Sequence, residues 1–238
     1  PQTERFPLLP QNENLCMSIA GRLSIAVPPH GLFDLQDGTS SYLVRRFDRT
    51  AKGDKLRCED FAQILGEDDK YSGSIEQIGK KTLELSDVPG LDAQFLFERV
   101  LFNFLIGNGD AHLKNFSLLE KDGGGLRLSP AYDIVCSKAV IPNEDDCALA
   151  LNGKKNRIAR RDFEQLGDTL RIPPKAIGNI LDRLNQAFPM MLGMISHSWL
   201  SDAMQKKVQL VVEERHQRIF NRPPSQKPRQ PHRKGRII

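Results

Sequence analysis

The sequence predicts an α+β fold that is mostly α, in which a helix and a β-hairpin precede a larger helical body. Three observations predict it: a helical apolar pattern in residues 11–24, a hairpin signal in residues 31–48 and a strongly apolar segment in residues 92–107. The chain has 238 residues, 39% of them hydrophobic and 27% charged, as is typical of globular domains. No apolar stretch approaches the roughly 18 residues of a membrane span.

The N-terminal part combines one helix with one hairpin. Apolar residues of 11–24 recur at helical spacing, and Asn12 is a candidate N-cap. Residues 31–35 and 41–48 have the composition of strands, and Asp37-Gly38 between them is a strong turn signal. We therefore expect an antiparallel hairpin directly after the first helix.

The helical body is centred on residues 92–107, which are apolar on most faces of the predicted helix. Such a helix is buried on all sides. Residues 59–66 predict a short helix that Gly66 ends, because glycine readily adopts the left-handed conformation at a helix C-terminus. Further helices are predicted in residues 74–85, 161–168, 174–195 and 199–220, and a second hairpin in residues 116–135.

The chain is predicted to have three parts: residues 1–49, residues 50–221 and a basic tail in residues 222–238. The tail holds six Lys or Arg residues and no acid. Removing these cations from the total of +4 leaves a net charge of −2 for residues 1–221. We expect the Pro-rich tail to be disordered, and either solvated or in contact with nucleic acid or another acidic surface. The four cysteines form no CxxC pair, which favours free thiols in a reducing, cytoplasmic setting.

Polar residues of several kinds gather in one short loop after the buried helix. Asp110, His112, Lys114 and Asn115 all follow the helix-ending Gly107. The spacing of Asp110 and Asn115, with a later acid after the second hairpin, resembles the catalytic apparatus of eukaryotic-like kinases. There an Asp orients the acceptor hydroxyl, and Asn and a second Asp bind Mg²⁺, which prefers hard oxygen ligands.

A closer resemblance is to the HipA-type bacterial Ser/Thr kinases, the toxins of toxin–antitoxin pairs. "IGNGDAHLKNFSLL" (106–119), followed by "RLSPAYDIV" (127–135), resembles the catalytic loop and metal-binding motif of that family. "LPQNENLCMSIAGRLSIAVP" (9–28), "YLVRRFDR" (42–49) and "LRCEDFAQILG" (56–66) are similar to its N-lobe helix, hinge strand and following helix. The resemblance implies a protein-kinase-like fold, with a partial N-lobe and a helical C-lobe.

The resemblance also implies a role for each site residue. Asp110 would be the catalytic base, assisted by His112 and Lys114, which would support loop geometry and phosphate charge. Asn115 and Asp133 would bind Mg²⁺. On the nucleotide side, the backbone near Arg46 and Phe47 would meet the adenine of ATP, and Glu13 would pair with an ATP-binding Lys. Residues of these types also occur in ordinary turns and on surfaces, and for His112 a purely packed role is an open alternative.

The resemblance further implies ATP and Mg²⁺ as cofactors, a protein substrate such as an aminoacyl-tRNA synthetase, and a DNA-binding antitoxin as partner. The family's phosphate-covering loop, strand Lys and N-terminal subdomain are not recognisable in the sequence. We expect them upstream of Pro1 or on another polypeptide, so that the 238 residues alone bind ATP weakly. Two alternatives remain: a catalytically silent kinase remnant that binds protein or nucleic acid, and a lipid kinase, which the Asp-x-His-x-x-Asn pattern also resembles.

Overall fold

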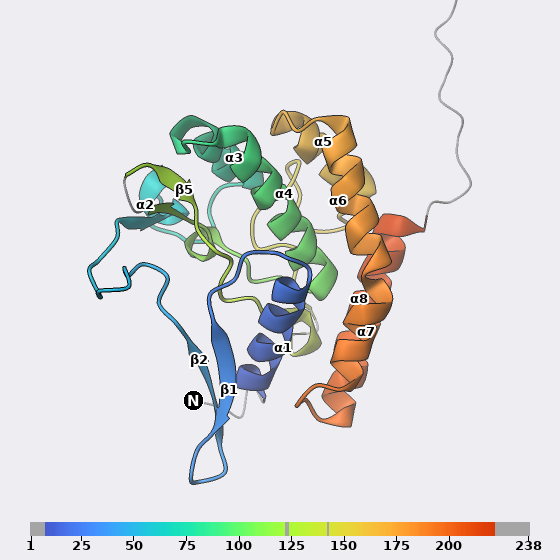
Figure 1. Cartoon of the computed structure of the whole chain (residues 1–238). Coiled ribbons are helices and arrows are strands. Elements are labelled where there is room, and N and C mark those ends of the chain that lie inside the picture. The colour runs from blue at the N-terminus through green and yellow to red at the C-terminus, as the bar shows by residue number, and fades with distance from the viewer. Residues whose placement is uncertain (1–7, 122–123, 142, 222–238) are drawn as a thin grey trace, which may run out of the picture.

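The computed structural model describes residues 8–121, 124–141 and 143–221 and confirms the predicted α+β class (Figure 1). The predicted tail of residues 222–238 lies outside this part of the chain. Helices are α1 (Leu9–Arg22), α2 (Phe61–Leu65), α3 (Ile75–Leu85), α4 (Pro89–Ile106), α5 (Arg160–Thr169), α6 (Pro174–Gln186), α7 (Phe188–Ser196) and α8 (Asp202–Phe220). Short 3-10 turns are η1 (Leu113–Asn115) and η2 (Ser137–Ala139). Strands are β1 (His30–Asp34), β2 (Ser40–Val44), β3 (Cys58–Asp60), β4 (Ser117–Glu120) and β5 (Leu126–Leu128).

Helix α1 and the β1–β2 hairpin form the N-terminal part, as predicted. The strands pair antiparallel from His30 opposite Val44 to Asp34 opposite Ser40, and Gly38 in the turn adopts φ +80°. Helix α1 packs against both strands, and the hairpin extends away from the helical body (Figure 1). Strand β2 ends at Val44 rather than near residue 48, so Arg46 and Phe47 follow the strand instead of belonging to it.

Asn12 is not the N-cap of α1. The helix begins at Leu9, with Pro10 in its first turn, where a missing N–H costs nothing. The buried Asn12 amide donates from Nδ2 to the carbonyl oxygen of Cys136 at 3.2 Å and accepts from the Cys136 N–H at 2.8 Å. An amide satisfies both groups of one peptide unit, so Asn12 fastens α1 to the segment just after Asp133.

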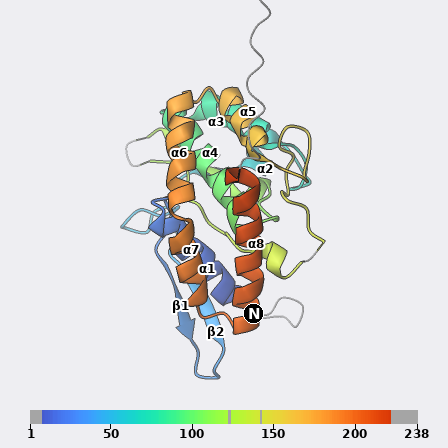
Figure 2. The ribbon, with the colours of Figure 1, turned by 90° about the vertical axis from the view of Figure 1, so that its right-hand side faces the viewer.

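Helix α4 is the buried centre of the helical body, as its composition predicts. Phe97, Leu101, Phe102 and Ile106 are fully buried. Helix α3 covers one side of α4, while α8 packs against α4 and α7 packs against α1 (Figure 2). Since neighbours pack around α4, the loop that follows it is attached to a firmly held element.

The prediction of one helix over residues 174–195 is wrong. The structure divides this segment into α6 and α7, with the break at Ala187. Pro189 explains the break, because its ring lacks an N–H and would clash with the carbonyl four residues earlier if a single helix continued. It is tolerated in the first turn of α7.

The second hairpin belongs to a three-stranded sheet of order β3–β4–β5. Strands β4 and β5 confirm the hairpin that the apolar runs around residues 121–125 predict, whereas the three-residue β3 was not predicted. The helix predicted in residues 59–66 begins at Phe61 after an Asp60 capping box and ends at Gly66 with φ +70°. All four cysteines are free, as predicted. In the described part of the chain, no helix is both long and apolar enough to cross a bilayer.

Candidate active site

The Asp110 loop begins where α4 ends at Gly107. This residue adopts φ +77°, a conformation that side chains with a Cβ rarely take. A Cβ here would lie 2.4 Å from Cγ1 of Val211 on α8, so the packing also requires glycine. The chain can therefore turn sharply and still stay against α8, which sets the direction of the loop.

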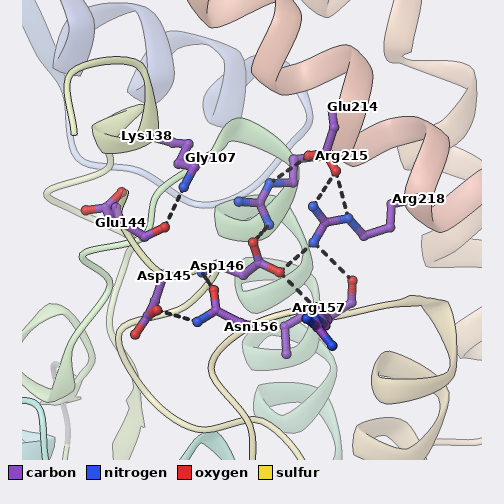
Figure 3. A network of polar contacts seen from close by, with 12 residues as sticks. Gly107, Lys138, Glu144, Asp145, Asp146, Asn156, Arg157, Glu214, Arg215 and Arg218 are labelled. Carbon is purple, nitrogen blue, oxygen red and sulfur yellow. Dashed lines mark hydrogen bonds and ion pairs between the residues drawn. The ribbon is translucent and has the colours of Figure 1, made fainter. Parts of the chain in front are cut away.

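Ser137 of η2 stabilises the Asp110 loop through hydrogen bonds. Its hydroxyl oxygen accepts the N–H of Gly109 at 2.9 Å, and the hydroxyl donates to Oε2 of Glu144 at 2.7 Å. The N–H of Lys138 donates to the carbonyl oxygen of Gly107 at 3.1 Å, and its Nζ donates to the carbonyl oxygen of Glu144 (Figure 3). Burial, and to a smaller extent the charge of Asp110, raises the pKa of Glu144. These contacts fix the backbone on both sides of Asn108, two residues before Asp110.

Asp110 is half-buried and receives one side-chain hydrogen bond. The hydroxyl of Tyr71, from the loop between α2 and α3, donates to its Oδ1 at 2.9 Å. Its own backbone N–H donates to Oδ1 of Asn108 at 3.3 Å. Among the described residues no other side chain donates to the Asp110 carboxylate, and its Oδ2 has no partner there. A carboxylate held on one oxygen and open on the other is suited to accept a proton.

His112 faces Lys70 rather than Asp110. Its Nε2 lies 2.8 Å from the Lys70 Nζ, and because an ammonium only donates, this nitrogen accepts and the ring proton lies on Nδ1. Burial, and then the charge of Lys70, lowers the pKa of His112, which is consistent with a neutral ring. Its Nδ1 is buried without a hydrogen-bond partner among the described residues. The geometry favours a positioning role over proton transfer.

Asn115 and Asp133 lie side by side, although 18 residues separate them. Nδ2 of Asn115 donates to Oδ2 of Asp133 at 2.5 Å, and Oδ1 of Asn115 accepts the His112 N–H at 2.9 Å. Asp133 is exposed and adopts φ +56°, a conformation that Asp tolerates better than most residues. The amide nitrogen of Asn115 therefore faces Asp133, while its oxygen keeps one lone pair for a metal ion beyond the bond from His112.

The oxygen ligands of Asn115 and Asp133 suit Mg²⁺ better than a metal ion that protein side chains coordinate completely. In the described residues no three His, Cys, Asp or Glu side chains are grouped as metal ligands. Mg²⁺ is commonly held by one or two protein oxygens and completes its octahedron with phosphate and water. Asn115 and Asp133 supply that kind of incomplete set.

The nucleotide-side residues have different surroundings. Glu13 lines a cavity of about 640 Å³ between α1 and the hairpin. Burial, followed by the charge of Asp133, raises its pKa to about 7, so Glu13 lies within electrostatic reach of the proposed metal ligand. Within the described part of the chain, no Lys or Arg forms an ion pair with it. The Phe47 ring lies 5.2 Å from the ring of Tyr132, next to Asp133.

Arg46 and Lys114 are less closely connected to the site. The exposed Arg46 guanidinium forms an ion pair with Asp48, at 2.8 Å from Nε to Oδ1. Hydrogen bonding from Arg46, opposed by some burial, lowers the pKa of Asp48 to about 2. Lys114 is exposed, and its Nζ makes no ion pair with any described residue, while its carbonyl accepts the Tyr132 hydroxyl at 2.8 Å. The structure thus brings Glu13, Phe47, Asn115 and Asp133 into one neighbourhood and leaves the Arg46 side chain outside it.

Sequence reasoning missed four supporting residues: Lys70, Tyr71, Ser137 and Glu144. None of them lies in a segment with helical or strand periodicity, so no local pattern identified them. Tyr71 lies 39 positions from Asp110, and only the folded chain brings the two together.

Comparison with known proteins assigns the chain to a family. The family model described as HipA-like C-terminal domain matches residues 1–192. The predicted kinase Y4dM of Sinorhizobium fredii is 36% identical over 172 residues, which is 66% of this chain and 41% of that protein. The predicted kinase Y4mE of the same organism is 29% identical over 220 residues, which is 85% of this chain and 52% of that protein. The chain therefore spans about half the length of these curated relatives.

Two solved structures share the fold. The HipA of Shewanella oneidensis, in a toxin–antitoxin complex with HipB and operator DNA, superposes with a TM-score of 0.73 at 20% identity, covering 90% of this chain and 56% of that one. The proinflammatory kinase CtkA of Helicobacter pylori superposes with a TM-score of 0.63 at 17% identity, covering 88% of this chain and 83% of that one. At these identities the likeness establishes a shared fold.

Proposed function

Because the chain belongs to the family of HipA-like C-terminal domains, we propose that it is the catalytic part of a protein kinase that transfers the γ-phosphoryl group of ATP to a Ser or Thr hydroxyl. The observation that carries the proposal is the Asn115–Asp133 pair beside Asp110, on a loop fixed to the buried helix α4. Phosphoryl transfer depends chiefly on such placement of charged groups.

In the proposed reaction Asp110 accepts the proton of the acceptor hydroxyl. The acceptor oxygen forms a bond to the γ-phosphorus, the bond from that phosphorus to the bridging oxygen breaks, and ADP leaves. Lys114 is exposed and directly precedes Asn115, so its ammonium group would offset the charge of a phosphate bound there. His112 is assigned to loop geometry, since Lys70 engages its Nε2.

Asn115 and Asp133 would hold Mg²⁺ through their side-chain oxygens. The ion would neutralise phosphate charge when bound. Glu13, Phe47 and the backbone at Arg46 are assigned to the nucleotide side, because Glu13 and Phe47 both lie next to the Tyr132–Asp133 segment. A Lys contributed by residues outside the described chain would satisfy Glu13.

Partners and substrate follow from the relatives as proposals. The Shewanella HipA was solved with HipB and operator DNA. We propose by analogy a DNA-binding antitoxin as partner and a protein of the translation machinery, such as an aminoacyl-tRNA synthetase, as substrate. The tail of residues 222–238 is a candidate for direct contact with nucleic acid, because it is basic.

The decisive test is Asp110→Ala. We expect the purified gene product to transfer ³²P from ATP to itself or to a protein acceptor in the presence of Mg²⁺, and the variant to keep only a small residual rate of this transfer. Asp168→Ala, at an exposed carboxylate of α5, serves as control and should keep the full rate. Undiminished transfer by the Asp110 variant would contradict the assignment.

A catalytically silent binding module is the second candidate. The uncompensated Glu13 favours it, because a complete nucleotide site would supply a cation there. Titration of ATP with Mg²⁺ against this chain, and against a version extended upstream, separates the two. No binding by either version would favour the module.

A further inference from the structure

The loop between α2 and α3 lies directly against the Asp110 loop. The N–H of Leu113 donates to the carbonyl oxygen of Lys70 at 3.1 Å, and the Lys70 Nζ binds the His112 ring at 2.8 Å. The Tyr71 ring meets the His112 ring edge-on, with centroids 5.4 Å apart at 84°. Backbone, charged and aromatic contacts therefore join the two loops around Asp110.

Hydrogen bonds hold the backbone of Tyr71 at both its N–H and its carbonyl group. Its backbone N–H donates to Oδ1 of Asp69 at 3.0 Å, and its carbonyl accepts from the Lys155 Nζ at 3.3 Å. The Lys70 Nζ lies 4.9 Å from the centre of its ring. Although Tyr71 is 40% exposed, these contacts orient its side chain so that the hydroxyl lies 2.9 Å from Oδ1 of Asp110.

The Tyr71 hydroxyl is suited to act as a permanent donor. Burial, followed by the hydrogen bond to Asp110, raises the pKa of Tyr71, so the phenol keeps its proton at neutral pH. A hydrogen bond from a hydroxyl to a carboxylate is among the stronger ones in proteins. It fixes the plane of the carboxylate and leaves Oδ2 free for another proton donor.

We propose that Tyr71 is a positioning residue for phosphoryl transfer: its hydroxyl holds Oδ1 of Asp110 so that Oδ2 meets the acceptor hydroxyl. This inference rests on the proposed function of Asp110. Tyr71 itself touches neither Asn115 nor Asp133 by any hydrogen bond among the described residues, so its contribution is to the acceptor side rather than to metal or nucleotide binding.

Tyr71→Phe in the purified gene product tests the proposal, because it removes one oxygen and keeps the ring. We expect kcat for phosphoryl transfer to fall by about 10-fold, since small misplacement of a reacting group is costly, while KM for ATP stays unchanged. Asp68→Asn, at an exposed residue of the same loop, is the matched control and should leave both constants unchanged.

A double-mutant cycle distinguishes positioning from a general structural role. If Tyr71 acts through Asp110, then Tyr71→Phe causes no further loss of the residual transfer in an Asp110→Ala background. A further loss, a raised KM for ATP or a lowered Tm would identify a structural role and overturn the inference. Unchanged kcat would also overturn it, and so would increased kcat, which would make Tyr71 a blocking residue.

The same experiment separates the two proposals. If Asp110→Ala removes all but a small residual rate of transfer and Tyr71→Phe has no effect, only the inference about Tyr71 fails. If Asp110→Ala retains transfer, or the wild-type protein shows none, the proposed function fails and the inference fails with it.

Discussion

Two carboxylates removed from bulk water, Glu13 in the N-terminal part and Asp146 in the helical body, have opposite surroundings. Asp146 is paired with Arg215 at 2.6 Å and with Arg218 at 2.5 Å, and it accepts the Ile158 N–H at 3.0 Å (Figure 3). Burial alone would raise its pKa, but the Ile158 N–H and the two arginines outweigh that effect and lower it. Glu13 has no such cation in the described chain, and its pKa is raised.

The apolar surfaces of the two regions differ less than these carboxylates do. Most large side chains of α4 are buried, but Leu91 and Phe95 near its start are 43% and 44% exposed, close to the 52% and 55% of Phe33 and Leu43 in the hairpin. The contrast between the regions therefore lies in how their charged groups are paired. The N-terminal part leaves Glu13 without a cation among the described residues, on the side that carries the proposed nucleotide residues.

Asp146→Asn should have the largest effect on stability. It leaves the buried Arg215, which also lies 4.6 Å from the centre of the Phe104 ring, with Glu214 at 3.3 Å as its remaining carboxylate partner among the described residues. Removing one partner of a buried ion pair costs about 3–5 kcal/mol. Urea unfolding followed by circular dichroism should show this loss. The control is Asp145→Asn at the exposed neighbour, for which we expect a change below about 0.5 kcal/mol. Equal effects of the two substitutions would remove the contrast between the regions.

A second contrast uses two glycines with positive φ. Gly107→Ala places a Cβ 2.4 Å from Val211 at φ +77°, whereas Gly38→Ala at φ +80° meets nothing within 4 Å. Backbone strain alone costs about 1 kcal/mol, and overpacking adds to it at Gly107, for a total of about 2–3 kcal/mol. Chemical denaturation of both variants measures the difference. A loss at Gly38 as large as that at Gly107 would show that strain, and not packing against α8, dominates.

Local patterns predicted much of the fold and the centre of the site, whereas distant contacts escaped prediction. The apolar composition of α4, the end of α2 at Gly66 and the Asp37-Gly38 turn are encoded within a few residues, and each prediction is confirmed. The bond of Asn12 to Cys136 spans 124 positions and contradicts the local N-cap signal.

The same difference between local patterns and distant contacts applies to the candidate site. Asp110 and Asn115 were recognised by their spacing, and the structure brings Asn115 to Asp133. The contacts of Tyr71 with Asp110 and of Lys70 with His112 depend on how the α2–α3 loop packs, which no periodicity records. The catalytic roles of these residues stay predictions until the variants are assayed.

Glu13→Gln should give a smaller effect, with a sign that depends on pH. Since folding raises the pKa of Glu13 to about 7, the folded state binds more protons than the unfolded state between about pH 4.5 and pH 7. The contribution of Glu13 to stability therefore falls as pH rises through this window, and glutamine escapes that loss. We expect the variant to match the wild type near pH 4.5 and to exceed it by about 1–3 kcal/mol at pH 8.

Urea denaturation at pH 4.5 and pH 8 measures this difference, with Glu84→Gln, at an exposed carboxylate of α3, as the control that should show no such pH-dependent gain. Titration with Mg²⁺ and ATP at pH 8 extends the test. If a bound cation satisfies Glu13, the wild type should gain more stability from the ligands than the variant does. A variant that is less stable than the wild type at pH 8 without ligands would mean that Glu13 is already compensated. The contrast with Asp146 would then no longer distinguish the two regions.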